Sequence, residues 1–148
     1  MGHPMHPFLT HFPMALLPVS LLGDVLEAWN GGGFWREFSF WCLAIGLVVS
    51  LPVFITGLID FVSIPPGGPR ERIAMRHMMV MIAAIALFAG SFFVRFGKTA
   101  PGDGILAIAL ALSGLGFIAL LYGGWNGGEL VYRYGVGGQK PDHSKDHP

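Results

Sequence analysis

The chain has 148 residues, of which 53% are hydrophobic and only 12% charged, and its formal net charge is zero. A soluble domain carries about 25% charged residues, so this composition excludes an ordinary soluble domain and indicates an integral membrane protein in contact with a lipid bilayer. The balanced charge gives no indication of a nucleic-acid partner. The single cysteine, Cys42, excludes an internal disulfide.

The N-terminal stretch carries His3, His6 and His11 directly before the first apolar run. It has neither a basic start nor a small-residue cleavage site. We therefore expect the first apolar run to remain as a membrane anchor rather than to be removed as a signal peptide.

Four apolar runs are each close to the roughly 20 residues that a membrane-spanning helix needs. They cover approximately residues 12–29, 38–61, 77–96 and 105–125. The runs do not alternate, and four strands could not close into a barrel in lipid, so strands are excluded. Short loops predict an all-α antiparallel bundle of four transmembrane helices within residues 1–138. The polar segment 139–148 is predicted to be a disordered tail.

The distribution of basic residues predicts the orientation in the membrane. In an up-down bundle the N-terminus, the second loop and the C-terminus lie on one side. That side holds six of the nine Lys and Arg residues: Arg70, Arg72, Arg76, Arg133, Lys140 and Lys145. The other side holds Arg36, Arg95 and Lys98. The bias places both termini in the cytoplasm.

The same side collects most of the ionisable groups near helix ends. They are His6 and His11 before the first helix, Asp60 at the end of the second, His77 at the start of the third, and Glu129 after the fourth. Because the first and third helices are diagonal, we expect His11 and His77 to face each other at similar depth. Asp24 lies near the other end, where we expect Arg36, Arg95 or Lys98 to neutralise it.

Helical spacing predicts a further polar group at this end. If the fourth helix continues past its glycines, Asn126, Glu129 and Arg133 form a stripe, with Glu129 and Arg133 in the favourable i,i+4 order. With Asp60, these residues form the predicted polar cluster.

Three segments carry a resemblance to a known family. They are His6-Pro7-Phe8-Leu9-Thr10-His11-Phe12-Pro13-Met14-Ala15-Leu16-Leu17, Gly57-Leu58-Ile59-Asp60, and the ending Gly127-Gly128-Glu129-Leu130-Val131-Tyr132-Arg133-Tyr134-Gly135-Val136-Gly137. They resemble a bacterial membrane family known as domain of unknown function twenty-two thirty-one. The resemblance covers almost the whole chain. It implies four helices in the bacterial inner membrane and no established activity. Some members are joined to redox domains, which favours an electron-transfer role.

The leading functional hypothesis is a b-type haem between His11 and His77, with Met14 and Met81 lining an apolar pocket. Asp60 or Glu129 would orient a ligand histidine. The protein would then be an electron-transfer subunit that works with a redox protein or a larger membrane complex.

Several alternatives remain open. His6, His11 and His77 suit a transition-metal ion. Asp24, Asp60 and Glu129, with kinks at Pro18 and Pro52, suit a proton or ion path. An accessory structural subunit and a homo-oligomer are also compatible with the sequence. No hydrolase or phosphate-binding motif is present.

Overall fold

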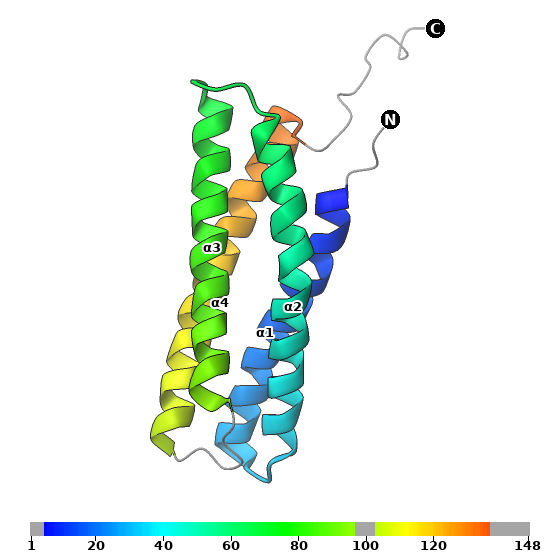
Figure 1. The fold of residues 1–148 in the computed structure, drawn as a ribbon. Coiled ribbons are helices and arrows are strands. Elements are labelled where there is room, and N and C mark those ends of the chain that lie inside the picture. The colour runs from blue at the N-terminus through cyan, green and yellow to red at the C-terminus, as the bar shows by residue number, and fades with distance from the viewer. Residues whose placement is uncertain (1–4, 97–102, 137–148) are drawn as a thin grey trace, which may run out of the picture.

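The computed structural model describes residues 5–96 and 103–136. Four helices form an antiparallel bundle (Figure 1): α1 (Met5–Asn30), α2 (Phe34–Val62), α3 (Pro69–Arg95) and α4 (Asp103–Tyr134). Each helix is long and apolar enough to cross a membrane. The predicted four-helix membrane bundle is therefore confirmed. We call the end with the start of α1 and the α2–α3 loop the histidine end, and the opposite end the Asp24 end.

The helices are longer than the apolar runs that predicted them. α1 begins at Met5, so His6 and His11 lie inside the helix rather than before it. α3 begins at Pro69, where the missing N–H of proline costs nothing. α4 continues through its glycine pairs to Tyr134. Apolarity marks only the part of each helix that suits hydrocarbon, and the helices continue beyond it. The predicted tail, residues 139–148, lies outside the described residues.

α1 packs closely on α2, and α3 packs closely on α4, which gives two helical hairpins. Small residues allow this approach, as the sequence predicted. A Cβ atom at Gly46 of α2 would lie 2.8 Å from Leu17 Cδ2 of α1. A Cβ atom at Gly116 of α4 would lie 3.0 Å from the Phe88 ring of α3. In each hairpin, therefore, one large buried side chain packs directly against a glycine of the neighbouring helix.

The second hairpin repeats the packing pattern of the first. A shift of 71 residues, the separation of Asp24 and Arg95, places the buried residues of α1 on those of α3. The matched pairs are Pro13 and Ala84, Leu17 and Phe88, Ser20 and Ser91, and Asp24 and Arg95. At a shift one residue shorter, buried residues of α2 match those of α4: Ser39 and Ala109, Leu43 and Ser113, Gly46 and Gly116, Ser50 and Leu120, and Val53 and Gly123.

Both hairpins start at the histidine end (Figure 1), so they are parallel repeats about an approximate twofold axis along the bundle. In this arrangement α1 and α3 lie diagonally opposite each other, because α1 packs against α2 and α4, and α3 packs against the same two helices. A residue of α1 that points to the axis therefore faces its counterpart in α3.

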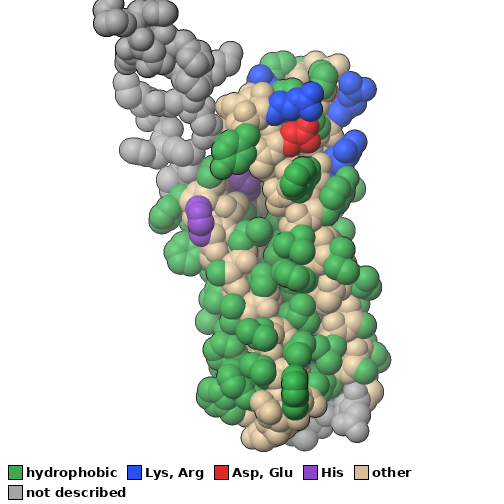
Figure 2. Space-filling view, turned by 180° about the vertical axis from the view of Figure 1, so that it is seen from behind, with side chains coloured by type: hydrophobic (Ala, Val, Ile, Leu, Met, Phe, Trp, Pro, Cys, Tyr) green, Lys and Arg blue, Asp and Glu red, His purple; other side chains and the backbone are tan. Residues whose placement is uncertain are grey.

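The outer surface has the distribution expected of a membrane protein. Apolar side chains cover most of its length, and basic side chains gather at the histidine end (Figure 2). Exposed aromatic side chains stand near both ends: Trp29 and Phe34 at the Asp24 end, and Trp125 and Tyr132 toward the histidine end. Aromatic residues favour the two membrane–water interfaces, so these positions mark the borders of the apolar belt.

Candidate functional site

The Asp24 end contains a buried ion pair between the two hairpins. The guanidinium of Arg95 donates to both carboxylate oxygens of Asp24, at 2.6 and 2.7 Å. The side chains are only 6% and 1% exposed. Of the three cations that the sequence offered for Asp24, Arg95 is the one that binds it. Arg36 instead pairs with Glu27 at 2.6 Å, and Lys98 lies outside the described residues.

Serine hydroxyls complete the bonding of this pair. The Ser39 hydroxyl donates to Asp24 and accepts from Arg95 Nη1 at 3.1 Å. The Ser91 hydroxyl accepts from Arg95 Nη2 at 2.7 Å and from Ser113 at 2.8 Å. A buried charge pair is tolerable when its remaining polar atoms are also bonded. The five side chains therefore form one satisfied network that joins all four helices.

The ion pair between Asp24 and Arg95 shows which faces of α1 and α3 point to the axis of the bundle, and two histidines lie on those faces. Asp24 and Arg95 occupy matched positions and meet across the axis. His6 precedes Asp24, and His77 precedes Arg95, by about five helical turns or roughly 27 Å. A whole number of turns returns to the same helix face, so His6 and His77 also face the axis.

Each of these imidazoles is held by a main-chain carbonyl of the neighbouring helix. His6 Nδ1 lies 3.0 Å from the oxygen of Val53, and His77 Nδ1 lies 2.8 Å from the oxygen of Gly123. A carbonyl oxygen only accepts, so Nδ1 carries the proton and donates it in both rings. In a neutral imidazole Nε2 then keeps its lone pair. Val53 and Gly123 are matched residues, so the same contact occurs twice.

A glycine supports each ring one turn further along. A Cβ atom at Gly57 would lie 2.8 Å from His6 Cε1, and one at Gly127 would lie 3.0 Å from His77 Cε1. Glycine is the one residue that leaves room for the ring at these two positions. The two histidines, two carbonyls and two glycines form what we call the histidine pair site.

His11 does not belong to the histidine pair site. Its side chain is exposed, and its Nδ1 lies 3.1 Å from the main-chain oxygen of Phe8 in its own helix. The expectation that His11 faces His77 therefore fails, because His11 lies on another face of α1 than His6 and Asp24. The histidine of α1 at the position that matches His77 is His6.

The two methionines predicted to line a pocket both approach the histidine end of α4. Met81 Sδ would lie 2.5 Å from a Cβ atom at Gly123, the residue whose carbonyl holds His77. Met14 Cε would lie 3.5 Å from a Cβ atom at Gly124. Met81 is half-buried, and Met14 is 37% exposed. They border the histidine pair site from α3 and α1.

Residues 2–140 match the model of a protein family described as "Predicted membrane protein (DUF2231)". The chain belongs to the DUF2231 family. No curated protein and no solved structure matches it. The family assignment agrees with the four apolar spans and names no activity.

The predicted polar cluster of this DUF2231 protein is spread over several environments. Asn126 is buried and donates to the Tyr122 oxygen at 2.7 Å. Glu129 and Arg133 form the predicted i,i+4 pair at 2.9 Å, largely exposed on the Arg133 side. Asp60 lines a separate cavity near the α2–α3 loop. Main-chain carbonyls, rather than Asp60 or Glu129, orient the histidines.

Among the described residues, no three His, Cys, Asp or Glu side chains come together as a metal site. The predicted His6, His11 and His77 metal centre is therefore not formed, because His11 points away. The sequence did contain a signal for His6 and His77. His6 is as far from Asp24 as His77 is from Arg95, and Gly46 is as far from Gly57 on α2 as Gly116 is from Gly127 on α4.

Proposed function

We propose that this protein binds a b-type haem through Nε2 of His6 and Nε2 of His77, and that it acts as an electron-transfer subunit of the membrane. The observation that carries the proposal is the repeated contact at Nδ1. A carbonyl bond to one ring nitrogen fixes the tautomer and the ring orientation, and it raises the basicity of the other nitrogen as a ligand.

The donor set fits a haem better than a free metal ion. A haem iron takes four ligands from its own macrocycle and needs only two from the protein, and four-helix bundles commonly hold such groups between facing helices. A free ion would need three or four protein ligands, and the described residues bring no such group together. When bound, a haem would supply one-electron transfer.

The chain's own residues have defined parts in this proposal. The carbonyls of Val53 and Gly123 orient the imidazoles. Gly57 and Gly127 leave room for the two imidazole rings beside α2 and α4. Met14 and Met81 provide apolar, adaptable walls that keep water away. With both termini cytoplasmic, the site would lie on the cytoplasmic side of the inner membrane, within reach of a redox partner.

The transport hypothesis has less support from the same geometry. Asp24 forms an ion pair with Arg95 at one end of the bundle, and Asp60 lies at the other end. Between these layers the core is made of Leu17, Leu43 and Phe88, which are fully buried. An apolar middle with charges only at its ends is a barrier to ions rather than a path.

The test is a reduced-minus-oxidised absorption spectrum of the protein, expressed with ample haem and purified in mild detergent. We expect the sharp bands of a b-type haem, and their loss in His77→Ala. Elemental analysis of the same preparation distinguishes haem iron from a directly bound ion. A colourless wild-type protein that holds stoichiometric copper or zinc, or no metal, would refute the haem proposal.

A further inference from the structure

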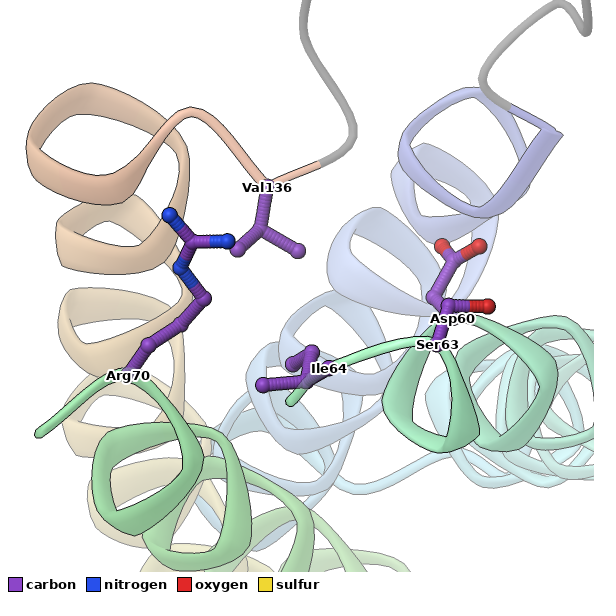
Figure 3. A pocket seen from close by; sticks show the side chains of 5 residues that line it. All are labelled: Asp60, Ser63, Ile64, Arg70 and Val136. Atoms are coloured by element: carbon purple, nitrogen blue, oxygen red, sulfur yellow. The ribbon is translucent and has the colours of Figure 1, made fainter. Parts of the chain in front are cut away.

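The cavity at the histidine end lies between the last turn of α2 and the first turn of α3. It has a volume of about 190 Å³ and is lined by Asp60, Ser63, Ile64, Arg70 and Val136. Figure 3 shows Asp60 and Arg70 on opposite walls, with the α2–α3 connection between them. The cavity lies at the end of two membrane-spanning helices, where hydrocarbon gives way to water.

The two charged side chains of this cavity have no partner within the described part of the chain. Asp60 and Arg70 are both half-buried, and neither side chain makes a hydrogen bond or ion pair with another described residue. Nearby charges are engaged differently: Glu129 binds Arg133, and Glu71 accepts from the Gly67 N–H at 2.6 Å. Half-buried charges that have no partner among the described residues are available to a ligand.

Both charges also stand at the unfavourable end of their helices. Asp60 lies near the C-terminus of α2, where the helix dipole is negative, and Arg70 lies near the N-terminus of α3, where it is positive. Each helix end therefore adds to the charge beside it instead of offsetting it. One wall of the cavity therefore carries a negative side chain and the other a positive one, and the first N–H groups of α3 add donors on the positive wall.

We propose that this cavity binds an ammonium–phosphate zwitterion, with the ammonium on Asp60 and the phosphate on Arg70 and the N-terminal turn of α3. At the membrane–water boundary, the abundant form of this chemistry is the headgroup of phosphatidylethanolamine. The site is independent of haem, because its charged groups are not those of the histidine pair site. A lone anion would satisfy Arg70 but would meet Asp60 as a like charge.

The experiment is native mass spectrometry of the full chain in mild detergent, with three phospholipids added in equal amounts. Phosphatidylethanolamine should be retained at least five-fold more than phosphatidylglycerol, which lacks an ammonium, or phosphatidylcholine, whose methylated nitrogen cannot donate to Asp60. Free phosphoethanolamine, added as a competitor, distinguishes a lipid headgroup from a soluble ligand of the same chemistry. Displacement of lipid at millimolar concentration shows recognition of the headgroup, and binding of free phosphoethanolamine without lipid retention assigns the same chemistry to a soluble ligand.

Single substitutions distinguish the contributions of Asp60 and Arg70 to lipid binding. Asp60→Asn should abolish the preference for phosphatidylethanolamine, and Arg70→Gln should lower retention of all three lipids. Arg72→Gln is the matched control, because Arg72 has the same charge on the same helix but is exposed outside the cavity. Circular dichroism should be unchanged in all three, since none of these side chains makes a hydrogen bond or ion pair with another residue that the structure describes. Equal retention of the three lipids by wild type, or equal effects of Arg70→Gln and Arg72→Gln, would overturn the proposal.

Discussion

The buried ion pair between Asp24 and Arg95 should dominate the stability of the bundle. In Asp24→Leu, Arg95 keeps its charge but loses two bonds of 2.6 and 2.7 Å while remaining only 6% exposed. Breaking a buried pair in this way costs about 3–5 kcal/mol. Arg133→Ala removes an exposed i,i+4 pair instead and should cost only about 0.3–0.5 kcal/mol.

The repeat makes the prediction sharper. Asp24→Leu/Arg95→Leu removes both charges, so it should cost less than the single change. Asp24→Arg/Arg95→Asp exchanges charges between matched positions, and serine hydroxyls that both donate and accept stand beside each of them. The exchange should therefore recover most of the lost stability.

The assay is reversible unfolding by SDS in mixed micelles, followed by circular dichroism, with the unfolding free energy compared among all five proteins. Two results would refute the reasoning. One is a cost below about 1 kcal/mol for Asp24→Leu, on the scale of an exposed pair. The other is a charge-exchanged protein that is no more stable than Asp24→Leu, which would mean that the two positions are not equivalent.

Further predictions concern the glycines and the serine network. Gly57→Ala and Gly127→Ala should each displace an imidazole and weaken haem retention. Gly128→Ala should not, because the space around its Cβ position is open. Haem absorbance per chain measures the retention, and an equal loss in all three variants would contradict the prediction. Gly46→Ala should destabilise the bundle by about 1–3 kcal/mol through overpacking against Leu17, while Gly114→Ala should be neutral or stabilising in the same unfolding assay. Ser39→Ala should cost about 1–3 kcal/mol, because it leaves part of a buried charge unsatisfied; an unchanged unfolding free energy would argue against the network.

The fold followed from the sequence because lipid imposes few alternatives. Apolar runs of sufficient length must form helices, and short loops make neighbouring helices antiparallel. The boundaries were less accurate, since α1 includes His6 and His11, and α4 extends to Tyr134. Helices continue past the hydrocarbon region, where apolarity no longer marks them.

The site was only partly predictable. Depth placed His11 and His77 together, but depth does not say which face of a helix a residue occupies. Helical phase decides that question, and it favours His6, which is five turns from Asp24. The phase became usable only once Asp24 and Arg95 were known to meet. The carbonyl partners of the histidines were invisible in the sequence, because any residue can offer a main-chain oxygen.

Haem content in two single variants tests the central claim most directly. His6→Ala and His11→Ala remove the same side chain from the same helix, within two turns of each other. If His6 and His77 are the ligands, His6→Ala should lose the b-type haem, and His11→Ala should retain the wild-type ratio of haem to protein. Retention of haem by His6→Ala with its loss in His11→Ala would contradict the account and return the site to the opposite face of α1.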